Sequence, residues 1–109
     1  MTRAFVETPV FTKKWFDLGL NDDDLSELQK ILLDNPKAGR VIKGTGSLRK
    51  IRIIYNGHGK RGGARVIYVD IEVKSKIHFI NVYSKGEKDD LTEAEKKAIV
   101  AVIDILKEE

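Results

Sequence analysis

The residues best suited to chemistry are cations that gather in the middle of the chain. Of the 20 basic residues in the sequence, nine lie between Asn35 and Val69, where none of the 17 acidic residues falls. They are Lys37, Arg40, Lys43, Arg49, Lys50, Arg52, Lys60, Arg61 and Arg65. Like charges held together cost stability unless a polyanion relieves their repulsion. The pattern makes nucleic acid the leading candidate for a partner.

These cations are predicted to lie on a sheet. A charged surface that is simply solvated is typically a helix on which acidic and basic residues are interleaved. Here alternation over residues 48–55 places Lys50 and Arg52 on one strand face, and Arg65 opens the strand paired with it. The loop between these strands adds Lys60 and Arg61. Three tyrosines of the same sheet, each able to stack on a base or to be half buried, are Tyr55, Tyr68 and Tyr83.

Other chemistries are excluded by residue type or by context. Residues 57–62 match G-x-G-x-x-G, but a strand follows them where a dinucleotide site needs a helix, so that site is rejected. No Walker A sequence occurs. The chain has no cysteine and only two histidines, His58 and His78, which give no recognisable metal-ligand spacing. No metal and no cofactor is expected.

Capping and breaking residues predict where the helices that must position these strands begin and end. Thr8 before Pro9, Asn21 before three aspartates, and the capping box of Thr92 and Glu95 each mark a helix N-terminus. The three helices are predicted to end at Gly19, at Asn35-Pro36 and at Lys107. Extended segments are predicted over residues 4–7, 48–55, 64–73 and 77–84.

The element order β-α-α-β-β-β-α predicts an α+β fold in a single domain, residues 1–109. A small, antiparallel-rich sheet with helices packed on one side is the expected arrangement. The last helix carries two adjacent apolar stripes, which indicate either a deeply packed helix or a docking surface for a partner. The first stripe contains Ala94, Ala98, Val102 and Ile105, and the second contains Ile99, Ile103 and Leu106.

The cellular compartment follows from what the sequence lacks. Without cysteine there is no disulfide framework, so a reducing compartment is expected. No apolar run approaches the roughly 20 residues that span a bilayer, and the N-terminus has no signal-peptide segment. We therefore expect a soluble cytoplasmic protein.

Three motifs, in this order, resemble the RelE/HigB toxins of bacterial type II toxin–antitoxin modules, and most of all the HigB-type branch. Residues 43–52 read KGTGSLRKIR, residues 60–68 read KRGGARVIY, and residues 82–92 read VYSKGEKDDLT. The resemblance covers essentially the whole chain. It implies the RelE-like fold, a small twisted sheet with helices packed on it, which agrees with the element order.

The resemblance also implies an activity, that of a metal-independent mRNA interferase. Such a toxin enters the ribosomal A site and cleaves the mRNA there, which inhibits translation. The 2′-hydroxyl attacks the adjacent phosphate and leaves a cyclic phosphate and a free 5′-hydroxyl. This chemistry needs a base, cations for the phosphorane and an acid for the leaving oxygen.

Carried over residue by residue, the resemblance implies catalytic roles for Lys50, Arg52, Arg65 and Tyr83. Arg52 and Arg65 would clamp the scissile phosphate, because guanidinium groups bind phosphate in a fixed bidentate geometry. Lys50 would be the base, since neighbouring cations disfavour its charged form, and Tyr83 would be the acid or a base-stacking group. Flanking residues expected to bind RNA are Arg49, Lys60, Arg61, Tyr68 and Lys85.

The implied partners are mRNA, the ribosomal A site and a cognate antitoxin of the helix-turn-helix, HigA-like kind. The antitoxin would bind through a helix in a groove or an added strand, and DNA would be contacted only indirectly, through the antitoxin. No membrane partner is expected. Two alternatives stay open. One is a ParE-like inhibitor of DNA gyrase, which shares the fold but lacks the basic cluster, and the other is a non-catalytic RNA- or ribosome-binding module.

Overall fold

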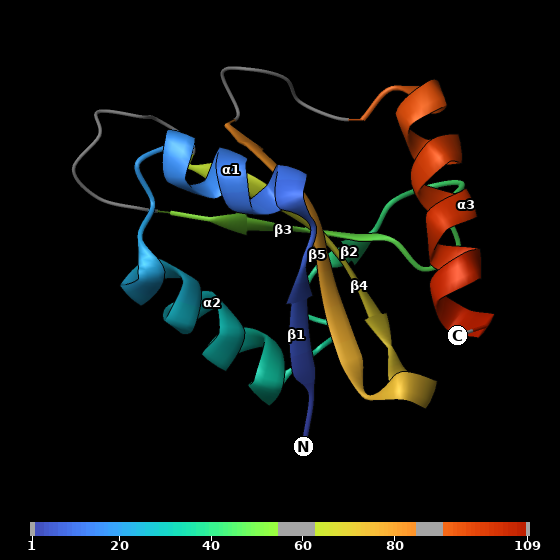
Figure 1. The fold of residues 1–109 in the computed structure, drawn as a ribbon, viewed down its shortest axis with the longest axis horizontal. Helices are drawn as coiled ribbons and strands as arrows, with labels where there is room; N and C mark the ends of the chain where they lie inside the picture. Colours follow the sequence, from blue (N-terminus) through green and yellow to red (C-terminus); the bar gives the residue numbers. More distant parts are fainter. Residues whose placement is uncertain (1, 55–62, 85–90, 109) are drawn as a thin grey trace.

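The computed structural model describes residues 2–54, 63–84 and 91–108, which form one five-stranded sheet flanked by helices (Figure 1). Its strands are β1 (Ala4–Glu7), β2 (Arg40–Val41), β3 (Arg49–Ile53), β4 (Ala64–Ile71) and β5 (Lys76–Ser84). Their order in the sheet is β1-β5-β4-β3-β2; β1 runs parallel to β5 and the other neighbours are antiparallel. The predicted α+β class is confirmed, and so is the element order apart from the added two-residue β2.

The helices begin where the capping residues predict. In α1 (Pro9–Asp17), the Thr8 hydroxyl accepts a hydrogen bond from the Phe11 amide at 3.0 Å. In α2 (Asp22–Asp34), Asn21 and Asp24 cap each other's backbone amides, both at 2.9 Å. In α3 (Glu93–Glu108), Thr92 and Glu95 form the same kind of capping box.

A short 3-10 turn, η1 (Glu72–Lys74), joins β4 to β5. None of the described helices is long and apolar enough to span a bilayer.

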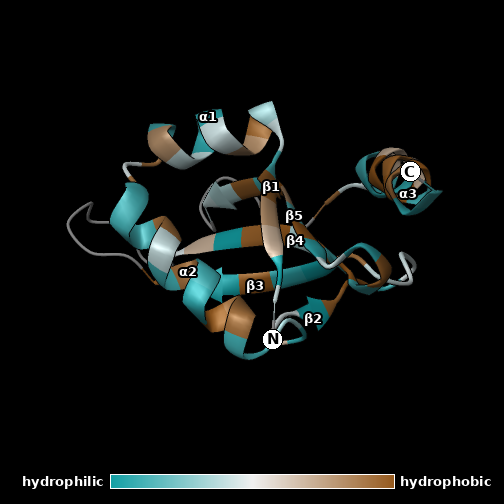
Figure 2. Ribbon diagram, turned by 60° about the horizontal axis from the view of Figure 1, so that its bottom comes forward, coloured by the Kyte–Doolittle hydropathy of each residue, from teal (hydrophilic) through white to brown (hydrophobic). Residues whose placement is uncertain are grey.

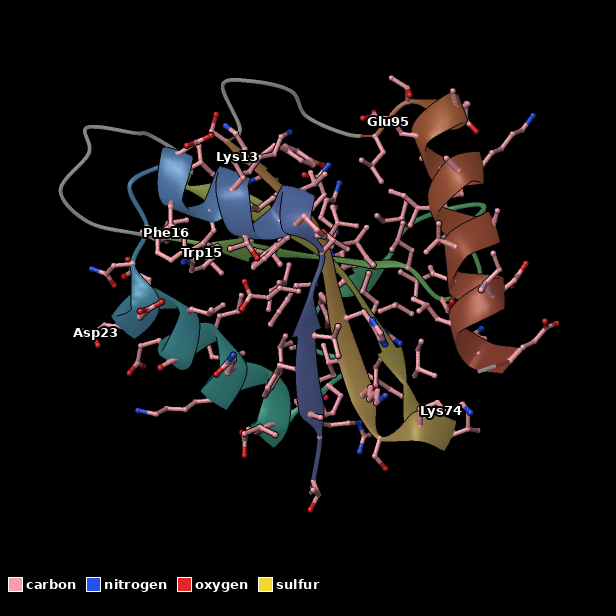
Figure 3. All side chains as sticks on the ribbon, in the orientation of Figure 1. Lys13, Trp15, Phe16, Asp23, Lys74 and Glu95 are labelled. Carbon is pink, nitrogen blue, oxygen red and sulfur yellow. The ribbon has the colours of Figure 1, made fainter. Side chains whose placement is uncertain are left out.

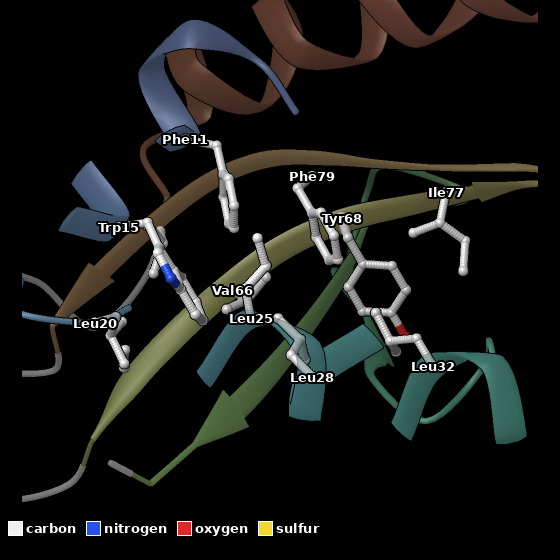
Figure 4. Packing of buried hydrophobic residues seen from close by; sticks show 12 residues of the cluster. Phe11, Trp15, Leu20, Leu25, Leu28, Leu32, Val66, Tyr68, Ile77 and Phe79 are labelled. Atoms are coloured by element: carbon white, nitrogen blue, oxygen red, sulfur yellow. The ribbon is translucent and has the colours of Figure 1, made fainter. Parts of the chain in front are cut away.

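One face of the sheet is sealed by α1 and α2. Phe11 lies 4.9 Å from Phe79 and 5.4 Å from Trp15, measured between ring centroids, and all three rings are at most 1% exposed (Figure 4). From the sheet, Val66 and Tyr68 of β4 complete this cluster. Burial of this many aromatic and aliphatic side chains provides the main favourable contribution to folding.

The opposite face of the sheet holds a second cluster under α3. Ile67 and Val69 of β4 pack there with Ile103, while Ile99 and Leu106 of α3 lie partly buried against them. Because neighbouring residues of β4 alternate between the two clusters, this strand is buried on both faces. The expectation of helices on one side is therefore wrong: α1 and α2 lie on one side of the sheet and α3 on the other (Figures 1 and 2).

The two apolar stripes of α3 have different surroundings. Ile99, Ile103 and Leu106 face the sheet, whereas Val102 and Ile105 are 48% and 58% exposed. The outward stripe borders an apolar groove of about 340 Å³ between α3, β5 and the start of α1. Its lining residues include Val10, Ile80, Ala98 and Val102, and Figure 3 shows Glu95 projecting from the first turn of α3 on the same side. Only one stripe is packed in this chain.

A β-bulge in β5 changes the alternation of that strand. Ile67 is opposite Asn81 and Tyr68 is opposite Phe79, which leaves Ile80 as an extra residue. As a result Phe79 and Val82, three residues apart, both face α1 and α2, while Ile80 and Tyr83 both lie in the cluster under α3. The bulge thus sets which face of the sheet receives the end of β5.

Candidate nucleic-acid interface

Three of the predicted catalytic residues form a row across the sheet. Arg52 of β3 is directly opposite Arg65 of β4, and Arg65 is directly opposite Tyr83 of β5. Directly opposite residues of antiparallel strands have Cα atoms about 4.5–5.5 Å apart and project to the same face. The structure therefore brings these three side chains together on the α3 side of the sheet.

Lys50 lies one step further along the same face. Leu48, two residues before it, packs in the cluster under α3, and so does Ile67, which is directly opposite Lys50. Alternation then places Lys50 and Arg52 on the α3 side. Arg52 is exposed, and Lys50 and Arg65 are half-buried. We refer to Lys50, Arg52 and Arg65 as the cationic face.

β3 has the composition that such a face requires. From Lys50 to Ile53 hydrophilic and hydrophobic residues alternate along it, so Lys50 and Arg52 point to one side while Ile51 and Ile53 pack toward α1 and α2 (Figure 2). β4 contributes only Arg65 at its start, and its later residues on that face are apolar. The α3 side of the sheet is thus divided into an apolar half under α3 and a cationic half beyond it.

Tyr83 lies in this row but is not open to solvent. Its side chain is 0% exposed and belongs to the apolar cluster with Leu91 and Ile103. A general acid must reach the leaving oxygen of its substrate, which a fully buried phenol does not do in this conformation. Tyr83 thus lies beside Arg65 in the sheet, while its burial does not fit a role as acid or base-stacking group.

Arg49 and Tyr68 lie on the other face of the sheet. They are directly opposite each other, and Tyr68 is 0% exposed within the cluster under α1 and α2. The Tyr68 hydroxyl donates to the carbonyl of Pro36 at 2.9 Å and accepts from the amide of Gly39 at 2.8 Å. Arg49 donates to the Gly39 carbonyl at 2.7 Å. Burial is the main cause that raises the pKa of Tyr68.

The prediction that Arg49 and Tyr68 bind RNA is therefore corrected, because their polar groups hold the segment between α2 and β2. Gly39 in that segment passes so close to the sheet that a Cβ atom would lie 2.8 Å from Tyr68 and 2.9 Å from the carbonyl oxygen of Lys50. The pair thus fixes the backbone beside Lys50. The remaining predicted binding residues, Lys60, Arg61 and Lys85, lie outside the described residues, as does Tyr55.

The arrangement suits phosphate chemistry. Two guanidinium groups that face each other across neighbouring strands can hold the oxygens of one phosphate from two sides. Within residues 2–54, 63–84 and 91–108, no three side chains of the metal-binding kinds gather at one place.

The structure adds one cation to which the sequence analysis gave no role. Arg40, one of the nine basic residues, is directly opposite Lys50. A two-residue strand gives no alternation from which this placement could be read.

A sheet with helices on both faces and a cluster of cations at one end defines the class of protein: a small α+β domain with a cationic surface on one face of its sheet. Over residues 8–108 the sequence matches the family described as the RelE toxin of the RelE/RelB toxin–antitoxin system. The chain belongs to this family, and so is a toxin of a type II toxin–antitoxin system.

Solved structures show the same fold at low sequence identity. A mutant of the E. coli toxin RelE in the free state aligns with a TM-score of 0.58 and 22% identity over 96% of this chain and 99% of that one. The toxin–antitoxin complex RelBE of E. coli aligns at 0.56 and 19% identity over 77% and 96% of the two chains. The RelE mutant in complex with a peptide of the antitoxin RelB aligns at 0.55 and 21% over 90% and 95%.

Proposed function

We propose that the chain is a ribosome-dependent, metal-independent endoribonuclease that cleaves mRNA in the A site and so inhibits translation in the cytoplasm. The observation that carries this proposal is the direct cross-strand pairing of Arg52 with Arg65, with Lys50 beside them on the same face. A gyrase inhibitor of this fold needs no such cluster, so the cations favour RNA cleavage.

The three cations suit the two charges that change during cleavage. The 2′-hydroxyl oxygen bonds to the adjacent phosphorus, and its proton passes to the side-chain nitrogen of Lys50, the proposed base. The phosphorane carries an additional negative charge, which Arg52 and Arg65 stabilise in bidentate geometry. The bond from phosphorus to the 5′-oxygen then breaks, that oxygen takes up a proton, and the products are a 2′,3′-cyclic phosphate and a 5′-hydroxyl.

For Tyr83 we propose a positioning role in place of the acid role. Its ring is buried and the residue is directly opposite Arg65, a position from which the ring would limit the rotamers of the arginine. Arg65 must hold its guanidinium in one orientation to clamp a phosphate, and packing against a rigid ring supports that orientation. The proton of the leaving oxygen then comes from another group or from water.

A cognate antitoxin is the second part of the proposal. RelE of E. coli is known in complex with its antitoxin and with an antitoxin peptide. In this chain the apolar groove between α3 and β5, next to exposed Val102 and Ile105, fits an amphipathic segment of such an antitoxin. The motifs that resemble the HigB-type branch favour an antitoxin of the helix-turn-helix kind.

A translation extract tests the nuclease. We expect cuts in translated mRNA at defined codons, with a cyclic phosphate upstream and a 5′-hydroxyl downstream of each cut. An otherwise identical mRNA with a 2′-O-methyl group at the cut nucleotide is the matched control, and it should stay intact because the nucleophile is blocked. Cleavage of both mRNAs would contradict the mechanism.

The same extract, supplied with supercoiled DNA and gyrase, separates the alternatives. Trapped DNA cleavage complexes with intact mRNA would identify a gyrase inhibitor. Binding to ribosomes without any cut would identify a non-catalytic module. Either result would overturn the proposal.

A further inference from the structure

Arg40 extends the cationic face to the edge of the sheet. It is directly opposite Lys50, and Ile42, two residues later, packs in the cluster under α3. The ladder continues past β2, since the Ile42 amide donates to the Leu48 carbonyl at 2.8 Å. Alternation therefore places the Arg40 side chain on the same side of the sheet as Lys50 and Arg52.

Arg40 differs from the other arginines of the described chain that lie outside the clamp. Arg3 bonds the carboxylate of Asp70 at 2.7 Å, and that bond is the main cause that raises its pKa. Arg49 donates to the Gly39 carbonyl. Arg40 is exposed, and within residues 2–54, 63–84 and 91–108 no carboxylate forms an ion pair with it. Its guanidinium thus has no structural task in the described chain.

The position of Arg40 has an energetic cost. Like charges placed directly opposite each other on neighbouring strands destabilise the pair, and β2 has only two residues to offset that cost. A bound anion between or beside the two cations would convert the repulsion into two favourable contacts. The edge strand is therefore better suited to the bound state than to the free protein.

We propose that Arg40 forms a second phosphate subsite, which binds a phosphate next to the one held by Arg52 and Arg65. The inference rests on the proposed function and deepens it. The backbone at Arg40 in β2 is about 10 Å from the point midway between Arg52 of β3 and Arg65 of β4. Two long arginine side chains reaching from these points suit adjacent phosphates of one strand. The RNA then crosses the sheet diagonally, from β4 toward the β2 edge, and passes Lys50.

The test measures binding to ribosomes whose A site holds a 2′-O-methyl codon, which resists cleavage. Identical ribosomes whose mRNA ends before the A site give the reference. The mRNA-dependent affinity is the ratio of the dissociation constant for the reference ribosomes to that for the ribosomes with a codon in the A site. We expect Arg40→Gln to reduce this ratio about tenfold. The slope of log affinity against log salt should fall by about 0.7, the value for one contact to a single strand.

Lys30→Gln is the matched control. It removes one positive charge from α2, where Lys30 is 73% exposed and pairs with Glu27. It should change neither the ratio nor the slope. Thermal unfolding at low salt adds a measurement that separates binding from a structural role: Arg40→Gln should unfold at the same temperature as the wild type or higher, because a repulsion is removed.

The outcomes distinguish this inference from the proposed function. If Arg65→Gln loses the mRNA-dependent affinity and Arg40→Gln keeps it, the second subsite is wrong and the nuclease proposal stands. If Arg40→Gln lowers the unfolding temperature along with the affinity, Arg40 is structural and the inference is also wrong. If the wild type has no mRNA-dependent affinity, both proposals fail.

Discussion

The two faces of the sheet differ in how completely they are covered. The face under α1 and α2 is closed by stacked aromatic rings, and even its polar atoms, such as the Tyr68 hydroxyl, are bonded within the chain. The face under α3 is apolar over one half only, and the other half presents Lys50, Arg52 and Arg65. A small domain can carry an electrostatically costly surface on one side because the other side supplies stability.

The comparison implies that stability and activity can be changed separately. Residues of the closed face should affect the free energy of unfolding and leave the activity of the folded protein unchanged. Residues of the cationic face should do the reverse. β4 is the element common to both, since Val66 and Tyr68 belong to one face and Arg65 and Ile67 to the other.

The largest effect is expected for Phe11→Ala on the closed face. Removing a fully buried ring leaves a cavity between Trp15 and Phe79 and should lower the free energy of unfolding by about 3–5 kcal/mol, measured by urea denaturation. Phe16→Ala is the control on the same helix, because Phe16 is 50% exposed and its loss should cost less than about 1 kcal/mol. Equal losses would refute the closed core.

Next in size is Arg65→Ala on the cationic face. We expect mRNA cleavage to fall about 10²–10³-fold, as for the loss of one group that stabilises a transition-state charge. The free energy of unfolding should change by no more than about 1 kcal/mol, because Arg65 is outside both apolar clusters. Lys30→Gln controls for net charge. Cleavage at the wild-type rate would show that the site is misplaced.

A smaller effect is expected for Tyr68→Phe. The change leaves the buried Gly39 amide and the Pro36 carbonyl without a partner and should cost about 1–3 kcal/mol of unfolding free energy. Burial raises the pKa of Tyr68 above its ordinary value of 10.0, so its contribution is present below that pH and is lost as the pH rises further. The difference from wild type should shrink above pH 10; a constant difference would contradict the buried phenol.

The smallest effect is expected for Tyr83→Phe. A positioning ring without its hydroxyl should keep cleavage within about tenfold of wild type, since the loss of a general acid typically costs 10²–10⁴-fold. The pH–rate profile should superimpose on that of the wild type. A loss of the limb at high pH together with a larger drop in rate would restore Tyr83 as the acid.

The sequence was sufficient to predict the helices and the shared face of Lys50 and Arg52 in the sheet. Thr8, Asn21 and Thr92 cap helices where their side chains predict, because capping is local. Alternation in β3 placed Lys50 and Arg52 on one face and Arg49 on the other. Assigning Arg49 to RNA binding therefore conflicted with the alternation itself, and the structure resolves the conflict through its bond to Gly39.

The remaining features depend on tertiary packing. β2 has two residues and is defined only by its bonds to β3. Helices cover both faces of the sheet, and β4 is accordingly buried on both sides. An apolar run in the sequence does not by itself show whether a strand is buried on one face or on two. Tyr83 shares its apolar cluster with Leu91 and Ile103, which lie outside β5, so the alternation of β5 alone does not reveal its burial.

The bulge at Ile80 sets which residue of β5 lies beside Arg65. If the unshortened chain paired without a bulge, β5 would alternate regularly, Val82 would lie opposite Arg65, and the Tyr83 ring would turn toward the core beneath α1. Deleting the codon for Ile80 would instead restore regular alternation with Tyr83 still opposite Arg65, so β5 can lose this one residue and keep the aromatic neighbour at the clamp.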